Sequence, residues 1–309
     1  MDARSPGSAY GAGRTVTQYT GPEGPANWPD TCANGTRQSP IDFDLSTVVT
    51  DTTIPEFEFH AYNEPEEIWF KNKGDTVYGI KTNRSRRHIY ISGGGLESNY
   101  RFWQFHFHWG VDRSTGSEHT FNGLQYPLEL HMIHLRDDLE TTREALKREG
   151  EDTLAVFGVM FKVTETAPHN HALDLLLEDD DLFLKDKEIT KEIVLSQLLP
   201  FDRRTFFRYQ GSLTTPPCTE VVTWTVFAEP LLISEEQLEK FRKTTYEDED
   251  GRQQRMTFNY RPTQPVHGRT IYMRTPTSHV QSHPAAAGHR ISASAVAIVF
   301  LVLLTRTLI

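Results

Sequence analysis

Three histidines stand at spacings that suit the binding of a metal ion. His106 and His108 are two residues apart, and His131 lies in a second apolar segment, Leu128 to Leu135. Alternate side chains of an extended strand share a face, so His106 and His108 point the same way if their segment is a strand. Three neutral imidazoles leave the fourth tetrahedral position of a zinc ion free for water, which is typical of a catalytic site. The sequence therefore predicts an open zinc centre.

Two further polar residues fall on the same faces as these histidines. Gln104 precedes His106 by two residues, and Glu129 precedes His131 by two. An amide oxygen and a carboxylate at these positions suit acceptors for the outer ring N–H of each ligand, which fixes its tautomer. The opposite face of the first segment is apolar and predicted to be core: Phe105, Phe107 and Trp109. A lone His-x-His pair would most simply be a coincidence on a solvated strand. The apolar opposite face and the Glu129–His131 pair argue against that interpretation.

Composition and pattern indicate a strand-rich chain with few helices. Short apolar alternations recur along 309 residues that include 20 Gly and 17 Pro, and a single β-rich domain of about 250 residues is common. One short helix is expected at 234–241, where Ser234 and Gln237 have the spacing of a capping box. A formal net charge of -10, without a basic stripe, argues against a nucleic-acid partner.

Five stretches of the chain closely resemble the α-class carbonic anhydrases, and in particular their extracellular, membrane-anchored members. The resemblance runs from about Gly21 to Met273 in the family's order and spacing, and it implies one catalytic domain at 21–275. We expect a mostly β (α+β) fold, with a large, mainly antiparallel central sheet and short peripheral helices. The stretches are Gln38-Ser39-Pro40-Ile41, Ser117-Glu118-His119-Thr120, Glu129-Leu130-His131, Tyr209 to Cys218 and Asn259 to Pro265.

The resemblance implies a role for each polar residue in a reversible hydration of CO2 to bicarbonate and a proton. The zinc ligands would be His106, His108 and His131, supported by Gln104 and Glu129. Thr214 would orient the zinc hydroxide, Glu118 would hold Thr214, and Thr215 would line the substrate side. An apolar wall for CO2 would comprise Ile133, Val156, Leu213, Val222 and Trp224. Without the resemblance these five read as ordinary core, and His119, Tyr209 and His134 read as structural residues.

The position of the family's proton shuttle is occupied by an aspartate. Fast members carry a histidine after an Asn-Gly-type turn, and here Asp75 follows Asn72-Lys73-Gly74. An aspartate with a pKa of about 3.9 is poorly matched to a zinc water near 7, whereas histidine has a pKa of about 6.5. We therefore expect slow proton transfer. Tyr19 matches the family's cavity tyrosine, and nothing in the spacing puts His60 or His88 in the cavity.

The two cysteines have a counterpart in the same family. Its extracellular members join the positions of Cys32 and Cys218 by a disulfide, so the resemblance implies one here, the alternative being two free core cysteines. Asn34-Gly-Thr36 and Asn83-Arg-Ser85 are glycosylation acceptors by pattern. Together these features favour a secretory route.

The end of the chain resembles a signal for a glycosylphosphatidylinositol anchor. Ile291 to Leu304 is a 14-residue stretch of apolar and small residues, short for a bilayer span of about 20 residues. Small residues precede it, so we expect a polar linker at 276–290 and a hydrophobic signal at 291–309. The predicted location is the outer face of the plasma membrane; a single-span anchor or a secreted protein is the alternative. Residues 1–20 are expected to form an extension, in which Met1 to Gly13 shows no apolar signal peptide.

Three functions compete on this sequence. A zinc hydratase, expected to be monomeric, is favoured. A non-catalytic binding or matrix protein of the same fold is the alternative, but silent members usually lose a ligand histidine and this chain keeps all three. A different metalloenzyme is disfavoured, because the chain has no His-Glu-x-x-His motif and lacks the glutamate that a cupin places after His-x-His.

Overall fold

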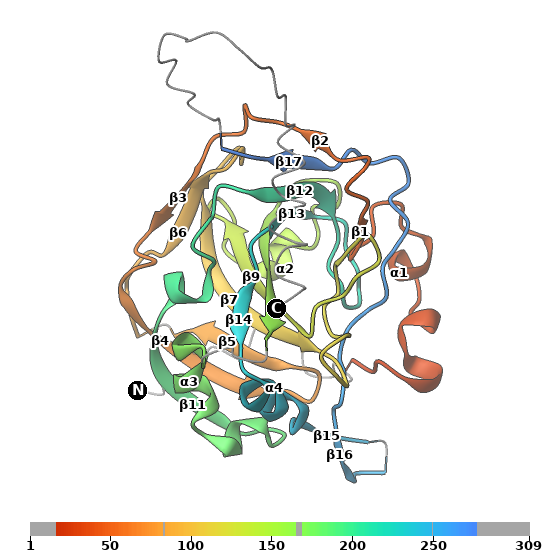
Figure 1. Cartoon of the computed structure of the whole chain (residues 1–309), viewed down its shortest axis with the longest axis vertical. Coiled ribbons are helices and arrows are strands. Elements are labelled where there is room, and N and C mark those ends of the chain that lie inside the picture. The colour runs from red at the N-terminus through yellow and green to blue at the C-terminus, as the bar shows by residue number, and fades with distance from the viewer. Residues whose placement is uncertain (1–16, 83, 165–168, 249, 277–309) are drawn as a thin grey trace, which may run out of the picture.

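The computed structural model of the chain describes residues 17–82, 84–164, 169–248 and 250–276, in which strands contribute more residues than helices (Figure 1). The strands of the main sheet are β2 (Val49–Thr50), β3 (Phe57–His60), β4 (Pro65–Asn72), β5 (Val77–Lys81), β6 (Tyr90–Gly93), β7 (Tyr100–Trp109), β9 (Leu128–Arg136), β10 (Leu154–Val163), β11 (Glu188–Val194), β12 (Phe206–Gly211), β13 (Val222–Phe227), β14 (Leu231–Ile233) and β17 (Tyr272–Arg274). The two small sheets are β1 (Asp42–Phe43) with β8 (Thr120–Phe121), and β15 (Thr245–Glu247) with β16 (Gln253–Arg255).

The helices are short and lie around this sheet. The α-helices are α1 (Thr31–Asn34), α2 (Thr142–Ala145), α3 (His171–Leu177) and α4 (Glu235–Arg242). The 3-10 helices are η2 (Gly21–Glu23), η3 (Pro25–Asn27), η4 (Asp180–Phe183) and η5 (Leu195–Leu198). The predicted capping box is confirmed: Ser234 precedes α4, its hydroxyl accepts from the Gln237 N–H, and the Gln237 side chain accepts from the Ser234 N–H.

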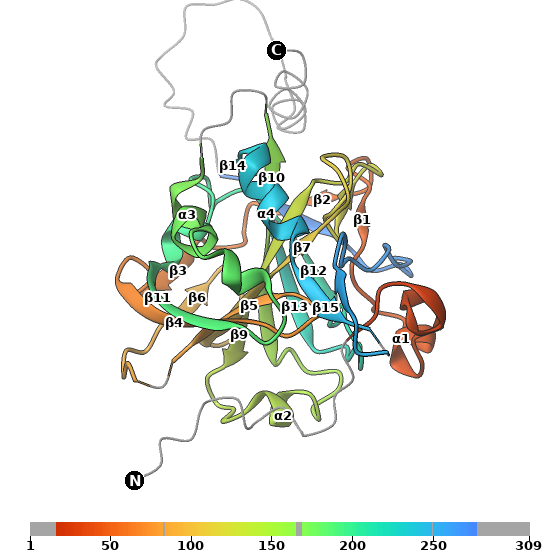
Figure 2. The same cartoon turned by 90° about the horizontal axis from the view of Figure 1, so that it is seen from below.

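The main sheet has 13 strands, and its central path runs β11-β4-β5-β7-β9-β10-β13-β12-β17-β2. Most neighbours are antiparallel, while β10 pairs in parallel with β13 and β14, and β17 with β2. The predicted fold, mostly β with a large, mainly antiparallel sheet and short helices, is confirmed. Figure 2 shows α3 and α4 together on one side and α2 at the opposite end of the view, on the loop that follows β9.

The middle of the sheet sets the two faces that the sequence predicts. β7 and β9 are antiparallel, and His106 lies opposite His131 in their register. Phe105, Phe107 and Trp109 point away from these histidines into the larger apolar core, where each is at most 1% exposed. Because the side-chain period of a strand is two, burying one set of side chains forces the other set onto the opposite face.

One disulfide ties the start of the described chain to a later loop. Cys32 of α1 is bonded to Cys218 across a separation of 186 residues, which confirms the predicted pairing. Buried side chains support both ends of the bridge, because Arg261 Nη2 donates to the Cys32 carbonyl at 2.8 Å and Gln38 Nε2 to the Cys218 carbonyl at 3.1 Å. Cys218 lies four residues after Thr214, so the bridge also braces the loop that carries Thr214.

Several predicted segments lie outside the described residues. They are Asn83, the hydrophobic segment 291–309, and most of the extension 1–20 and of the linker 276–290. Within the described part of the chain, no helix has the length and apolar character needed to span a bilayer.

The long loop that the disulfide closes predicts a large effect on stability. Replacing both Cys32 and Cys218 with Ser should lower the free energy of unfolding by about 5 kcal/mol in the chain-entropy account. Urea unfolding of the oxidised wild type and of the double variant measures the difference. Wild-type protein reduced with dithiothreitol is the matched control and should unfold at the same urea concentration as the variant. Identical midpoints for variant and oxidised wild type would contradict the expectation.

Candidate metal centre

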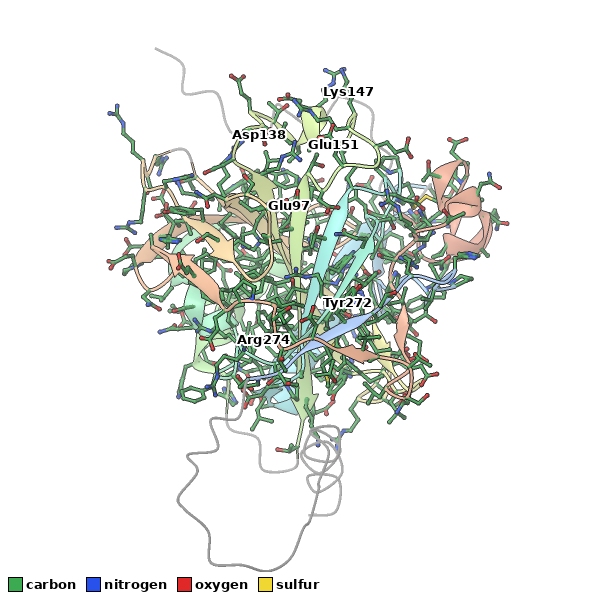
Figure 3. All side chains as sticks on the ribbon, turned by 90° about the horizontal axis from the view of Figure 1, so that it is seen from above. Glu97, Asp138, Lys147, Glu151, Tyr272 and Arg274 are labelled. Atoms are coloured by element: carbon green, nitrogen blue, oxygen red, sulfur yellow. A yellow bond between two sulfur atoms is a disulfide. The ribbon has the colours of Figure 1, made fainter. Side chains whose placement is uncertain are left out.

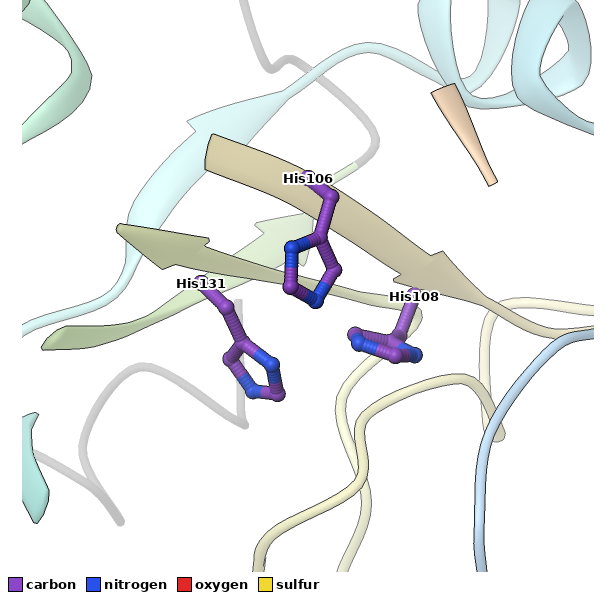
Figure 4. A group of neighbouring side chains, drawn as sticks. All are labelled: His106, His108 and His131. Atoms are coloured by element: carbon purple, nitrogen blue, oxygen red, sulfur yellow. The ribbon is translucent and has the colours of Figure 1, made fainter. Parts of the chain in front are cut away.

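Three imidazole rings from two neighbouring strands converge on one point. His106 and His108 come from β7 and His131 from β9, and their rings face one another (Figure 4). The ring centroids are 5.0 Å apart for His106 and His108, 5.2 Å for His106 and His131, and 4.5 Å for His108 and His131. One nitrogen from each ring lies within 4.8 Å of the other two. The fold therefore brings the predicted ligands together.

The outer nitrogens of two of these rings are held by the side chains that the sequence singles out. His106 Nδ1 lies 3.1 Å from Gln104 Oε1, and His131 Nε2 lies 2.8 Å from Glu129 Oε1. Both oxygens are acceptors, so each of these ring nitrogens donates a proton. The lone pairs of His106 Nε2 and His131 Nδ1 are left to face the centre, which is the arrangement that supporting hydrogen bonds impose on metal-binding histidines.

The third ring has a partner that the sequence reasoning missed. His108 Nδ1 donates to the backbone carbonyl of Asn259 at 2.7 Å, and these residues are 151 positions apart. The Asn259 side chain binds the same strand, since its Oδ1 accepts from the Trp109 N–H at 2.8 Å. The only signal in the sequence was that Asn259 opens one of the stretches that resemble the carbonic anhydrases. A carbonyl acceptor cannot be identified from residue type.

The donor set fits a zinc ion. Burial lowers the pKa of His108 to about 3 and that of His106 well below its usual range, so these rings are neutral near pH 7. Burial also lowers the pKa of His131. The inner Nε2 of His108 is buried and makes no hydrogen bond with the described residues. The three inner ring nitrogens are therefore available as neutral ligands for one ion. Three such ligands are what a tetrahedral Zn²⁺ site with an open fourth position requires.

Glu129 is a buried hub that joins the ligand His131 to a second histidine. Its Oε1 also accepts from His119 Nδ1 at 2.7 Å, and its Oε2 accepts from the backbone N–H groups of Glu118 and His119 at 2.8 and 2.9 Å. Burial alone would raise the pKa of Glu129, but His119 and His131 outweigh it by charge and hydrogen bonding and hold it well below its ordinary value. The carboxylate is thus ionised and fully engaged.

Three residues interpreted as structural are buried and hydrogen-bonded. His119 Nε2 lies 2.7 Å from the Tyr209 hydroxyl, which donates to Ser39 Oγ at 2.8 Å. His134 points to the other side of the sheet, where its Nδ1 donates to the Ala155 carbonyl at 3.0 Å. These contacts are consistent with a structural role for His134, whereas His119 is linked to the triad because it shares Glu129 with His131.

Glu118 and Thr214 lie at the edge of the triad. Burial raises the pKa of Glu118 well above its ordinary value, and hydrogen bonds from the Thr214 side chain and the Arg261 backbone partly offset that effect. The Arg261 N–H donates to Glu118 Oε1 at 2.8 Å, while Oε2 lies 3.5 Å from His108 Nε2. A dication at the triad would favour the ionised carboxylate at this distance.

The triad lies in a cavity of about 580 Å³ whose lining is more apolar than polar. The described residues that line it include seven apolar side chains: Trp103, Ile133, Leu146, Leu154, Val156, Leu213 and Trp224. Of the predicted residues, the lining contains Tyr19, Gln104, Ile133, Val156, Leu213, Thr214, Thr215 and Trp224. Trp103, Tyr78 and Arg143 line it without having been singled out in the sequence.

Two predicted residues do not line the cavity. Val222 is 1% exposed and packs in the core, and Leu154, its partner in the β10–β13 register, lines the wall instead. Asp75 lies between β4 and β5, where its Oδ2 accepts from the Tyr78 hydroxyl at 3.2 Å. The Tyr78 ring lines the cavity, so Asp75 is one side chain removed from it.

The other histidines near this region are engaged elsewhere. His60 Nε2 lies 3.0 Å from Ser92 Oγ, and His88 Nε2 lies 3.0 Å from Asp137 Oδ1. Both rings stack on Tyr90, and neither lines the cavity among the described residues.

Comparison with known proteins shows the family. The profile described as eukaryotic-type carbonic anhydrase matches residues 23–275. Carbonic anhydrase 7 of Mus musculus is 37% identical over 259 residues, which cover 82% of this chain and 95% of that protein. Carbonic anhydrase 7 of Homo sapiens is 36% identical over 260 residues, with the same coverage of 82% and 95%. Mitochondrial carbonic anhydrase 5A of Homo sapiens is 34% identical over 252 residues, covering 79% and 78%. The chain belongs to the eukaryotic-type carbonic anhydrase family.

Proposed function

We propose that the protein binds one zinc ion through His106, His108 and His131 and hydrates CO2 reversibly. The observation that carries the proposal is the set of three neutral nitrogens, two of them backed by Gln104 and Glu129, inside a partly apolar cavity. When bound, zinc with three histidine ligands lowers the pKa of its water to about 7 and so supplies a nucleophile at neutral pH.

The chain's own residues would position the reactants. The Thr214 hydroxyl donates a hydrogen bond to Glu118, so it can only accept a hydrogen bond from the reacting oxygen. This contact directs a lone pair of the reacting oxygen at the carbon of CO2. Ile133, Val156 and Leu213 offer this small apolar substrate a wall without competing hydrogen bonds. Thr215 lines the substrate side. A non-catalytic binding protein of the same family is the alternative, and the complete triad and its intact support favour the enzyme.

Removal of any one ligand should abolish both metal binding and activity. His106→Ala, His108→Ala and His131→Ala should each lose zinc by elemental analysis and lose CO2 hydration by stopped flow, because two imidazoles hold zinc weakly. Wild-type activity should rise with pH through a pKa of about 7. His134→Gln, which alters a buried histidine on the other side of the sheet, is the matched control and should keep its zinc. A ligand variant with full zinc and full rate would exclude this ligand set.

Variants of Thr214 and Glu129 should distinguish orientation of the reacting oxygen from retention of the metal. Thr214→Ala should slow CO2 hydration by roughly 100-fold while zinc stays bound, because it removes orientation and not a ligand. Glu129→Ala should instead weaken zinc binding by about 10- to 100-fold, because the His131 ring loses its acceptor. Competition with a chelator measures the affinity, and stopped flow measures the rate. The opposite pattern, with zinc lost from Thr214→Ala and kept in Glu129→Ala, would show that the roles are reversed.

We also propose that Asp75 stands at the proton-shuttle position and that proton removal limits turnover. The expected signature is an ordinary kcat/KM with a low kcat that rises with buffer concentration, and imidazole should rescue it better than acetate because its pKa is closer to 7. Asp75→His should raise kcat about tenfold and reduce its dependence on buffer. Asp75→Asn serves as the control, because it removes the carboxylate charge and keeps an oxygen that can accept from the Tyr78 hydroxyl. A wild-type kcat that is high and indifferent to buffer would contradict this proposal.

The location of the protein is proposed from the sequence. We propose attachment to the outer cell surface through a glycosylphosphatidylinositol anchor, supported by the segment 276–309, the Cys32–Cys218 disulfide and the exposed acceptor Asn34. Phospholipase C specific for such anchors should release the protein from cells. Retention after that treatment, with residues 291–304 detected by mass spectrometry, would favour a single-span anchor.

A further inference from the structure

The cavity above the triad has one ionised side chain among the described residues that line it. That residue is Arg143 of α2. The rest of the lining is apolar, hydroxyl-bearing, amide or imidazole, and the three imidazoles are the proposed metal ligands, which bind zinc in their neutral form. Arg143 is also exposed to solvent, so its positive charge lies where the cavity opens.

Arg143 differs from the other arginines of the same loop because no ion pair joins it to a carboxylate in the described part of the chain. Arg148 pairs with Glu144 at 2.9 Å, with Glu151 at 3.7 Å and with Asp138 at 3.8 Å. Arg136 pairs with Asp138 at 2.7 Å and with Glu151 at 3.0 Å. Figure 3 shows Asp138 and Glu151, with Lys147, at the outer end of this loop. No carboxylate among the described residues forms such a pair with Arg143, so its charge is not neutralised locally.

We propose that Arg143 steers anions, bicarbonate in particular, into the cavity. The inference rests on the proposed function, in which bicarbonate is the product and the substrate of the reverse reaction. The chain has a formal net charge of -10, which repels anions at long range. A guanidinium at the mouth, without an ion pair among the described residues, adds a positive charge where an anion must enter. A charge at the rim of a site acts mainly on the association rate and on its salt dependence.

Two sulfonamides of the same shape test the proposal without measuring turnover. The anion is 4-sulfamoylbenzoate and its neutral analogue is 4-sulfamoylbenzamide, and both are added to the zinc-loaded full chain. Quenching of tryptophan fluorescence in stopped flow reports their association, because Trp103 and Trp224 line the cavity. The variants form a charge series, Arg143→Lys, Arg143→Gln and Arg143→Glu. Arg148→Gln removes an arginine of the same loop that is paired and does not line the cavity.

The expected result is an association rate that follows the charge at position 143 for the benzoate only. Arg143→Lys should match the wild type, Arg143→Gln should slow the benzoate about two- to fivefold, and Arg143→Glu should slow it by a similar factor again. These differences should shrink between 10 mM and 0.5 M salt, because the Debye length falls from about 30 Å to below 10 Å. Rates for the benzamide and for Arg148→Gln should stay at wild-type values.

Three results would overturn the proposal. One is a benzoate rate that is indifferent to the charge at position 143, and another is an equal change for benzoate and benzamide. The third is a loss that appears in Lys73→Gln in place of Arg143→Gln, because Lys73 also acts electrostatically on His106. Failure of both sulfonamides to bind the wild type would instead exclude the proposed zinc function, and anion steering would fail with it.

Discussion

The antiparallel pairing of β7 with β9 is the constraint on which the rest of the site depends. Its register sets His106 opposite His131 and His108 opposite Glu129, so that three rings and one carboxylate share a small area of one face. A slip of one residue in either strand would turn that strand's polar residues into the aromatic core. Phe105, Phe107 and Trp109 prevent such a slip, because each fills the core behind the sheet. The apolar side chains on one face of β7 thus fix which polar side chains lie on the other face.

Burying so many polar groups is tolerated because nearly every one has a partner. An unpaired buried donor or acceptor costs about 1–3 kcal/mol, and a charge costs more. Glu129 accepts four hydrogen bonds, and the outer nitrogens of the triad each meet an oxygen. The inner nitrogen of His108 is the exception in the triad, and Glu118 Oε2, 3.5 Å from it, also makes no hydrogen bond with the described residues. Two neighbouring buried atoms left unsatisfied indicate a place for a ligand.

Long-range connections tie the centre to distant parts of the chain. Residues 259–261 reach across the site, with the Asn259 carbonyl on His108 and the Arg261 N–H on Glu118. The Arg261 guanidinium continues to the Cys32 carbonyl, and Cys32 is bonded to Cys218 four residues after Thr214. The residues that would hold the metal and the residue that would orient the reacting oxygen are therefore tied to one framework. Preorganisation of this kind is what positioning catalysis requires.

The sequence by itself determined what depends on local backbone geometry. The two-residue period of a strand places Gln104, His106 and His108 on one face and Glu129 beside His131, and these faces could be predicted from spacing alone. Only the tertiary structure decided which distant segments meet. The Asn259 carbonyl on His108, Leu154 in place of Val222 at the cavity wall, and the position of Arg143 in the lining all follow from packing between remote elements. No local pattern encodes such contacts, because they depend on strand register and loop paths that the whole core sets together.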